Sequence, residues 1–436
     1  MAFDGYRVPR PEGRPLRVAL FSGNYNYTLD GANKALNRLV DHLERVEGAQ
    51  VRVYSPTSST PAFEPKGELI SVPSVAIPTR SDYRIAVGLP AAIRRNIEAF
   101  APDIFHLSAP DLLGHGALKL AKRMDAPVVA SLHTLFETYL DYYALGWLRP
   151  VVEAQLRSFY ADCDLVMAPS PVIAARMEAE GLGGRMRLWA RGVDGQLFNP
   201  LRRDLAWRRS QGIADGEATV AFFGRLVMEK GLGVFADAIE RVLAVRPGVK
   251  VLVIGDGPAR TWLEERLPQA VFTGFLTGAD LARALSSADI MLNPSKTETF
   301  GNVTLEAMAA GLAVVGADAP YHHALLRHGH TGLLAPATDA EAYAAAVLLL
   351  VDDEGKRRAM GQAARNASGA YQWSQVLAGV VDVYREALAL GGDFGRSGFA
   401  DEAAAHGLDH PVDLVHRGVE RRRPGTLGAV GKQPEA

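Results

Sequence analysis

Short runs of β-branched and apolar residues alternate with longer helical patterns along most of the chain, and this alternation limits the possible folds more than any other feature. Strands that are separated by helices usually pair in parallel within one sheet. The expected strands of the first half are Arg17–Ser22, Val51–Tyr54, Asp103–Leu107, Val128–Leu132 and Leu165–Ala168. Those of the second half are Val220–Gly224, Val249–Ile254, Ala270–Thr273, Ile290–Pro294 and Leu312–Gly316. Each set suffices for a doubly wound sheet, so the sequence predicts an α/β fold with two Rossmann-like domains.

The chain has 436 residues, which is too long for one compact core and also favours two domains. The join is expected within Val193–Arg209, because this segment holds Asn199-Pro200 and a basic stretch, LRRDLAWRR, without a strand pattern. A last helix is predicted from a serine cap at Ser374 to Ala389. The predicted units are 1–14 (disordered), 15–195 (first domain), 196–373 (second domain), 374–390 (last helix) and 391–436 (disordered tail).

Composition excludes several classes of protein. The net charge is −2, whereas a nucleic-acid-binding surface would show as a strong basic excess. Cys163 is the single cysteine, so a disulfide framework is impossible and a reducing cytoplasm is the expected location. The first fifteen residues lack the apolar core of a signal peptide, and no apolar run is long enough to span a bilayer.

The segment Pro294–Val315, PSKTETFGNVTLEAMAAGLAVV, reads as the end of a strand, a loop and then a helix from Asn302 to a C-terminal glycine. The N–H groups of the first helical turn lack partners within the helix and can bind hydroxyl or phosphate oxygens. Glu306 follows Asn302 by four residues and shares its face, so it can meet the loop that carries Glu298 and Phe300. Carboxylates suit vicinal hydroxyls, although a solvated loop and a solvated helix remain the alternative.

A second motif is FFGRLVMEKG, Phe222–Gly231, which directly follows a predicted strand. Ligands of open α/β sheets collect at such strand ends. Arg225 and Lys230 place two cations on one loop, where they can neutralise a departing diphosphate. A turn with two solvated charges is the simpler alternative.

A third motif, Ser22–Val40, has a glycine-containing loop and then a helix that opens near Gly31, with Asp30 as a candidate N-cap. Backbone N–H groups from Gly23 to Gly31 can lie beside phosphates, and the loop NYNY, from Asn24 to Tyr27, has the character of an acceptor-binding loop. The motif is not G-x-G-x-x-G, so no dinucleotide cofactor is expected. An ordinary strand–helix turn is the alternative.

His133 follows a predicted strand in ASLHTLFETY, where a sugar contact is reasonable, and His106 in IFHLSAP has a similar place. Two groups resemble metal sites without fitting one. Asp162-Cys163-Asp164 more simply closes a helix–strand turn. A histidine group lacks the spacing of a zinc site and is interpreted as a loop rim near the second-half motif; it comprises His322, His323, His328 and His330. No metal and no cofactor are therefore expected.

With these motifs in place, the chain resembles the retaining GT-B glycosyltransferases of the family-4 type over roughly residues 15–390. The glutamate pair and G-R-x-x-x-E-K-G carry the resemblance. The stretches HLSAPDLLGHGALKLAKRMDAPVVASLHT and RLWARGVDGQLFNP are similar to those of lipid-glycosylating members, such as sulfoquinovosyl- and mannosyl-diacylglycerol synthases. The resemblance implies that two Rossmann-like domains face a cleft and that the last helix crosses back to the first domain.

The resemblance also implies roles for individual residues. Glu306 would bind the ribose hydroxyls, and Glu298 would hold the donor hexose with the backbone of the next loop residues, which are Phe300, Gly301 and Asn302. Arg225 and Lys230 would bind the diphosphate, and His133 would contact the transferred sugar. The loop from Gly23 through Asp30 to Gly31 would lie near the diphosphate and the acceptor.

The predicted reaction is transfer of a hexosyl unit, with retention, from a nucleoside-diphosphate sugar to a lipid or lipid-linked hydroxyl. UDP is the first expectation for the nucleotide and GDP the second. No carboxylate pair has the pattern of a retaining glycosidase, so the family's front-face route is implied, in which the leaving diphosphate takes the acceptor proton. The alternatives are a nucleotide-sugar epimerase or hydrolase of the same fold, and a non-catalytic sugar-nucleotide-binding subunit.

Contact with the inner face of the cytoplasmic membrane is a further hypothesis. Basic residues surround the apolar stretch IAVGLPAAI, and LRRDLAWRR and the tail add more; they include Arg80, Arg84, Arg94, Arg95 and Arg421–Arg423. Basic residues beside apolar ones can seat a protein on anionic lipid. Solvated surface charge is the alternative.

Overall fold

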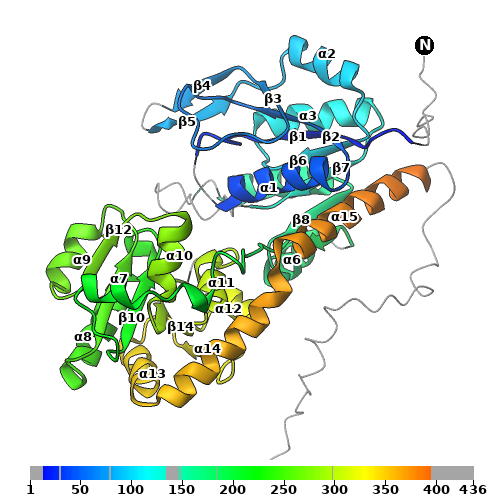
Figure 1. The fold of residues 1–436 in the computed structure, drawn as a ribbon. Helices are drawn as coiled ribbons and strands as arrows, with labels where there is room; N and C mark the ends of the chain where they lie inside the picture. The colour runs from blue at the N-terminus through cyan, green and yellow to red at the C-terminus, as the bar shows by residue number, and fades with distance from the viewer. Residues whose placement is uncertain are drawn as a thin grey trace, which may run out of the picture. The chain divides into compact units, whose positions relative to one another are not determined.

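The computed structural model describes residues 13–28, 31–77, 80–133, 147, 149–182, 184–296 and 298–393. In this part of the chain the first parallel sheet has the strand order β3-β2-β1-β6-β7-β8-β9 (Figure 1). Its strands are β1 (Arg17–Phe21), β2 (Gln50–Ser55), β3 (Glu68–Ser71), β6 (Ile104–Leu107), β7 (Val128–Ser131), β8 (Leu165–Ala168) and β9 (Met186–Leu188). The helices of this half are α1 (Gly31–Arg45), α2 (Ala91–Phe100), α3 (Leu112–Arg123), α5 (Arg149–Ala161) and α6 (Pro171–Met177). A separate antiparallel hairpin joins β4 (Ser74–Ile77) to β5 (Arg80–Ala86).

The second parallel sheet has the order β12-β11-β10-β13-β14-β15. Its strands are β10 (Thr219–Phe223), β11 (Lys250–Ile254), β12 (Val271–Gly274), β13 (Ile290–Asn293), β14 (Ala313–Ala317) and β15 (Leu333–Ala335). Its helices are α7 (Leu205–Ser210), α8 (Leu232–Val245), α9 (Arg260–Arg266), α10 (Gly278–Ser286), α11 (Asn302–Ala309), α12 (Pro320–Leu325), α13 (Ala340–Asp352) and α14 (Glu354–Ser368). Strand order reverses between β1 and β6 in one sheet and between β10 and β13 in the other, and ligands of open α/β sheets bind at the carboxyl ends of such strand pairs.

The prediction of two doubly wound parallel sheets is confirmed. All ten predicted strands are present, and their ends differ from the predicted ones by no more than a residue or two. The strands that sequence reasoning missed are the hairpin and the edge strands β3, β9 and β15. These edge strands have three or four residues, and β3 and β9 are only partly buried. Such strands lack the continuous apolar run of a central parallel strand, so no pattern marked them.

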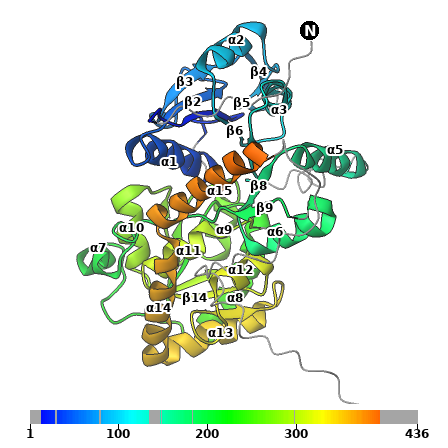
Figure 2. The ribbon, with the colours of Figure 1, turned by 90° about the vertical axis from the view of Figure 1, so that its right-hand side faces the viewer.

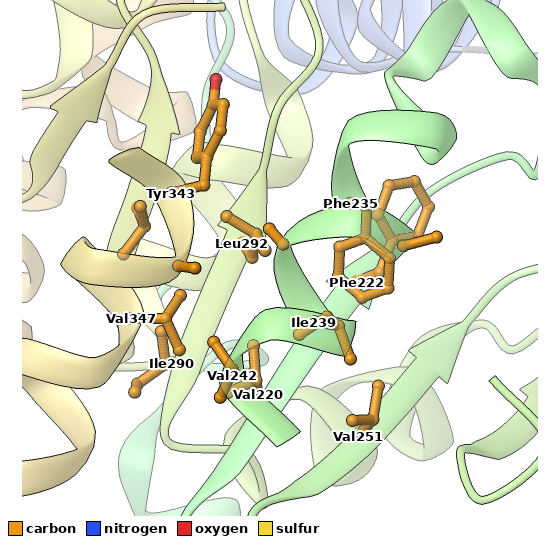
Figure 3. Close-up of a cluster of buried hydrophobic side chains, with 14 of the residues drawn as sticks. Val220, Phe222, Phe235, Ile239, Val242, Val251, Ile290, Leu292, Tyr343 and Val347 are labelled. Atoms are coloured by element: carbon orange, nitrogen blue, oxygen red, sulfur yellow. The ribbon is translucent and has the colours of Figure 1, made fainter. Parts of the chain in front are cut away.

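Each sheet is covered on both faces. In β1, Ala19 and Phe21 pack into one buried cluster, whereas Val18 and Leu20 pack into another with α1. In β10, Val220 and Phe222 face the cluster drawn in Figure 3, where they meet Ile239 and Val242 of α8 and Val347 of α13. Ala221 faces the opposite cluster. The alternation follows from the two-residue period of a strand and explains why both sheets are buried on both sides.

The last helix, α15, spans Trp373–Asp393. It begins one residue before Ser374, so the predicted serine cap is wrong. Its apolar face, which includes Val380, Val381 and Tyr384, shares a buried cluster with β1 and α1 of the first sheet (Figure 2). The domain limits at 195 and 373 and the disorder proposed for both ends stay predictions, since residues 1–12 and 394–436 lie outside the described part.

The basic stretch LRRDLAWRR, which was expected to be irregular, is instead a 3₁₀ turn, Pro200–Arg202, followed by α7. Arg208 is fully buried and donates hydrogen bonds to the carbonyl oxygens of Ser287, Ala214 and Glu217. With the Asp289 carboxylate 3.6 Å from Arg208 Nη1, these carbonyl oxygens offset the buried charge and anchor the segment to the second sheet.

Candidate active site

The loop between β13 and α11 is shaped by a glycine. Gly301 is the N-cap of α11 with φ 94°, a left-handed conformation that glycine adopts readily. A Cβ at this position would stand 2.9 Å from the Tyr321 ring, whose hydroxyl donates to the carbonyl oxygen of Ser295 at 2.7 Å. The predicted helix start at Asn302 and the glycine just past its end, Gly311 with φ 80°, are both confirmed.

A buried polar chain holds α11 against the sheet. The Asn293 amide donates to Thr304 Oγ1 at 3.1 Å, and the Thr304 hydroxyl faces His322 Nε2 at 3.1 Å. His322 Nδ1 faces the carbonyl oxygen of Ala317 at 2.8 Å, so it carries the ring proton. Burial lowers the pKa of His322 to about 4, which keeps the ring neutral. His322 is therefore a buried support on α12 and not part of a loop rim, and the interpretation of the histidine group is wrong for it.

The two second-half motifs meet. Gly231 has φ 76°, and a Cβ there would lie 2.8 Å from the carbonyl oxygen of Pro294. The glycine thus lets the loop after β10 touch the loop after β13, at the switch point of the sheet. Lys230 Nζ lies 2.6 Å from Glu298 Oε1, and both side chains keep about a quarter or less of their surface exposed, 26% and 20%. The structure therefore brings together the predicted diphosphate cation and the predicted hexose carboxylate.

Arg225 lies on the same loop as Lys230, but its side chain is exposed and has no ion-pair partner among the described residues. Its backbone is held by a second glycine loop. Leu226 N donates to the carbonyl oxygen of Asp256 at 2.9 Å, and a Cβ at Gly255 would lie 1.9 Å from the carbonyl oxygen of Gly224. The arginine therefore stands on a fixed backbone with an unengaged guanidinium, as an anion-binding group requires.

Phe300 and Asn302 differ in their surroundings. The Phe300 side chain is buried, with its ring 5.8 Å from that of Tyr371, so only its backbone remains for the predicted donor contact. Asn302 is half-buried, and a Cβ at Gly31 would stand 2.6 Å from its Nδ2. The start of α1 thus lies against the start of α11. The helix start at Gly31 is confirmed, while Asp30 lies outside the described residues.

Glu306 on α11 is a half-buried carboxyl whose pKa is affected by two opposing influences. Burial raises its pKa to about 7, and the charges of Lys34 and Arg38 on α1 act in the opposite direction. Sequence reasoning missed these two cations. Their spacing of four residues on one helix face, close behind the glycine loop, is the signal that could have found them.

The loop from Gly23 to Thr28 is braced by its own side chains. Tyr25, Asn26 and Tyr27 are buried, and the Tyr27 hydroxyl donates to the carbonyl oxygen of Gly23 at 2.7 Å. Asn24 Nδ2 donates to Thr28 Oγ1 at 3.0 Å. The expectation that these polar side chains line an acceptor site is therefore wrong for the three buried ones, because the loop uses them to fold.

His133 lies just beyond the carboxyl end of β7 and is half-buried. Its Nε2 is 2.8 Å from Ser131 Oγ, and its Nδ1 is 2.8 Å from Arg191 Nη2, so both ring nitrogens have protein partners. Its predicted sugar contact stays a prediction. His106 is fully buried, so a sugar contact by this side chain is wrong.

The turn Asp162–Asp164 joins α5 to β8 as expected. Asp162 pairs with Lys122, and Asp164 accepts from Val128 N at 2.7 Å. Within the described residues no group of three or more His, Cys, Asp and Glu side chains could hold a metal ion. Over the same residues, no helix is both long and apolar enough to cross a membrane.

Comparison with known proteins identifies the family. Residues 29–197 match the family described as Glycosyltransferase Family 4, and residues 217–353 match Glycosyl transferases group 1. The chain is 34% identical over 381 residues to a GDP-mannose-dependent alpha-mannosyltransferase of Mycolicibacterium smegmatis, covering 86% of this chain and 98% of that protein. The chain is a family-4 glycosyltransferase.

Two further relatives of this glycosyltransferase carry names from lipid chemistry or sulfosugar transfer. The sulfoquinovosyl transferase of Arabidopsis thaliana is 31% identical over 375 residues, covering 84% of this chain and 72% of that protein. The alpha-monoglucosyldiacylglycerol synthase of Streptococcus pneumoniae is 28% identical, covering 73% and 75%. The predicted resemblance to glycolipid-forming members is thereby confirmed.

The fold of the glycosyltransferase also matches solved structures. The sucrose-phosphate synthase of Thermosynechococcus elongatus superposes with a TM-score of 0.71 at 20% identity, covering 86% of this chain and all of that one. The GT-B fold with its two Rossmann-like sheets is confirmed, and the enzyme is a hexosyltransferase.

Proposed function

We propose that this glycosyltransferase moves a mannosyl or another hexosyl unit from a nucleoside-diphosphate sugar to a hydroxyl of a lipid acceptor, with retention at the anomeric carbon. The observation that carries the proposal is the meeting of two loops at the switch point of the second sheet, where Lys230 and Glu298 form an ion pair beside the exposed Arg225. One wall of this site thus offers cations for a diphosphate and a carboxylate for vicinal hydroxyls.

The ion pair suggests how the donor is received. In the described structure Glu298 neutralises Lys230 at 2.6 Å. A diphosphate that approaches Lys230 and Arg225 would take over that neutralisation, which releases the Glu298 carboxylate to accept hydrogen bonds from the hexose hydroxyls. Glu306, four residues into α11, would then accept hydrogen bonds from the ribose hydroxyls, and its ionised form does so most strongly, with both oxygens.

The transfer itself needs no further base in this scheme. The acceptor oxygen bonds to the anomeric carbon on the face from which the phosphate oxygen departs, and the acceptor proton passes to that oxygen. The two cations stabilise the charge that develops on the diphosphate. We propose that these fixed cations replace a metal ion, so activity should survive dialysis against a chelator.

The nucleotide is a choice between GDP and UDP. The relative that matches along 98% of its own length is GDP-mannose-dependent, which favours GDP-mannose; the sequence alone favoured UDP, so both belong in the test. The name alpha-monoglucosyldiacylglycerol synthase supports a lipid acceptor.

A donor panel tests this function. The full chain is incubated with GDP-mannose, UDP-glucose and other nucleotide hexoses, first in a thermal-shift assay and then with a membrane-lipid extract. We expect one donor to raise the melting temperature and to give a lipid product heavier by one hexosyl unit, with the anomeric configuration of the donor by NMR. Release of free sugar or an epimerised nucleotide without any acceptor would instead support the hydrolase or epimerase. No turnover with any donor would support the non-catalytic subunit.

Peripheral contact with anionic lipid is part of the proposal. Val75 and Ile85 lie opposite one another on the β4–β5 hairpin, and both are exposed, 56% and 45%, as is Val87. Arg95 of α2 is exposed in the same half of the chain. In the basic stretch before and within α7, Arg203 and Arg209 pair with Asp289 and Asp215. The side chain of Arg80 and all of Arg421–Arg423 lie outside the described part.

Co-sedimentation with vesicles tests this contact. We expect the full chain to bind phosphatidylglycerol-containing vesicles at low salt, and Ile85→Asp to weaken binding several-fold, because it places a charge on the apolar pair. Val46→Asp is the matched control, since Val46 is also exposed, 66%, but directly follows α1. Equal binding by both variants would contradict the assignment of this face.

A further inference from the structure

A chain of hydrogen bonds joins helix α15 to His133. Tyr384 Oη lies 2.5 Å from His106 Nδ1, and His106 Nε2 lies 2.8 Å from Ser131 Oγ. Ser131 Oγ lies 2.8 Å from His133 Nε2, and His133 Nδ1 lies 2.8 Å from Arg191 Nη2. Four of these side chains are buried and His133 is half-buried, so His133 is the member that a ligand can reach.

Arg191 fixes the tautomer of His133. A guanidinium only donates, so His133 Nδ1 must accept, and the single proton of the neutral ring must lie on Nε2. That proton points to Ser131 Oγ. The same serine oxygen also lies at hydrogen-bond distance from His106 Nε2, and His106 Nδ1 faces Tyr384. One donor-only cation therefore sets the tautomer of the ring that a ligand can reach.

The rings of His133 and His106 are both neutral. Burial and the charge of Arg191 lower the pKa of His133 well below its usual value, and burial lowers the pKa of His106 to about 3. The charged and titratable side chains that face His133 from the described elements are Arg191 and His106.

Trp189 keeps Arg191 in place. The indole is buried and lies edge-on to His133, with ring centroids 5.2 Å apart, and to His106 at 5.7 Å. The Arg191 guanidinium carbon lies 5.5 Å from the indole centroid, and its Nη1 donates to the carbonyl oxygen of Trp189 at 3.3 Å. Because the cation contacts both the indole and the backbone carbonyl of Trp189, it is held beside His133.

We propose that Arg191 is a positioning residue that makes His133 a hydrogen-bond donor at Nε2 and prevents it from acting as a base. The proposal deepens the function given above, on which it rests in one respect: the oxygen that replaces Ser131 Oγ would belong to the donor hexose or its phosphate. Such an oxygen can accept from Nε2–H, whereas a proton from the acceptor hydroxyl has no free lone pair on His133 to go to. That proton must pass to the departing phosphate oxygen.

The tautomer can be measured without any ligand. The full chain labelled with ¹⁵N-histidine is studied at pH 7 by long-range ¹H–¹⁵N correlation, and His133→Asn assigns the signal. We expect a neutral ring with its proton on Nε2. In Arg191→Met, Nδ1 loses its donor, so we expect the Nδ1–H tautomer or a protonated ring to become populated. For transfer, we expect kcat to fall roughly 10- to 100-fold, with a smaller change in the KM of the donor, because positioning is lost.

Two variants separate positioning from general support. Arg191→Lys keeps a donor-only cation and should restore the Nε2–H tautomer and most of the turnover. Arg187→Met is the matched control, since Arg187 is an arginine four residues earlier that pairs with Glu386 of α15, and it should leave the tautomer unchanged.

The outcomes are distinct. A wild-type His133 that is protonated at Nδ1 or on both nitrogens at pH 7 overturns the inference. An unchanged Nε2–H tautomer in folded Arg191→Met also overturns it. If the tautomers are as expected and no donor gives transfer, the proposed function fails while the inference about His133 stands.

Discussion

The donor loops of the second sheet and the His133 end of the first sheet both lie at the carboxyl ends of parallel strands, yet they are held in place differently. The donor loops depend on glycines with positive φ, such as Gly231 and Gly301, which let backbones touch. The His133 end depends on side-chain hydrogen bonds that span 278 residues of sequence, from His106 to Tyr384. The first arrangement is encoded locally, whereas the second requires the completed fold. Substitutions in the two regions should therefore have different effects: a lost cation at the donor loops lowers turnover most, whereas a lost hydrogen bond at the His133 end changes a tautomer or the stability.

The largest expected effect is on turnover at the donor loops. Lys230→Ala and Arg225→Ala should each lower kcat by roughly two orders of magnitude or more, about 3–4 kcal/mol of barrier, because each removes a fixed cation from the departing diphosphate. Steady-state transfer with the donor found in the panel measures this. Arg246→Ala is the control, since Arg246 pairs with Asp352 on the surface of the same half and its loss should leave kcat unchanged. Wild-type turnover in both loop variants would remove them from the site.

The next effect is on the backbone that joins the loops. Gly231→Ala should lower the free energy of unfolding by about 2–3 kcal/mol, because alanine disfavours φ 76° and its Cβ would press on the carbonyl oxygen of Pro294. Urea denaturation measures the change. Gly248→Ala is the matched control, since a Cβ there has open space, and it should stay within about 0.5 kcal/mol of wild type. Equal stability of the two variants would show that the loops do not depend on this contact.

The two regions also differ in how much of each could be predicted from the sequence. Lys230 and Glu298 could be predicted to share one site because each lies in a contiguous motif after a strand, and the strand order brings these strand ends together. Arg191 and Tyr384 were missed because their hydrogen-bond partners lie far away in the sequence. The contacts form only in the folded chain, where the segment after β9 and helix α15 pack against β6 and β7. Lys34 and Arg38 are an intermediate case. Their helical spacing is visible in the sequence, but Glu306, the carboxyl that they act on, is more than 250 residues away.

Helix α15 allows a smaller, complementary test. Tyr384→Phe should lower the free energy of unfolding by about 1–2 kcal/mol, because the buried His106 Nδ1 loses its hydrogen-bond partner. It should change kcat little, since Arg191 still holds His133. Tyr343→Phe is the matched control: Tyr343 is equally buried, and its hydroxyl has no hydrogen-bond partner in the described structure, so removal should be neutral or stabilising. A large loss of kcat in Tyr384→Phe would instead couple α15 directly to the reaction.

The smallest effect concerns pH and Glu306. Burial raises the pKa of this carboxyl to about 7 from its unfolded value of 4.5. The folded state therefore favours the protonated form, and wild-type stability should fall as pH rises from about 4.5 through 7 and then level off. Because the side chain is only half-buried and Lys34 and Arg38 lie near it, we expect a difference of about 1 kcal/mol between the two ends of that range.

Glu306→Gln separates the loss of stability on ionisation of Glu306 from the function of its carboxylate in donor binding. In the ligand-free protein the variant should be more stable than wild type by about 1 kcal/mol at pH 8 and equal to it at pH 4, because glutamine does not ionise. It should also bind the donor more weakly at pH 8, where the wild-type carboxylate is ionised and can accept hydrogen bonds from the ribose hydroxyls. Thermal unfolding at both pH values and a donor titration at pH 8 measure the two effects. If Glu306→Gln is less stable than wild type at pH 8, Lys34 and Arg38 stabilise the carboxylate even without donor. The donor loops would then depend on a partner that is distant in sequence, as the His133 end does.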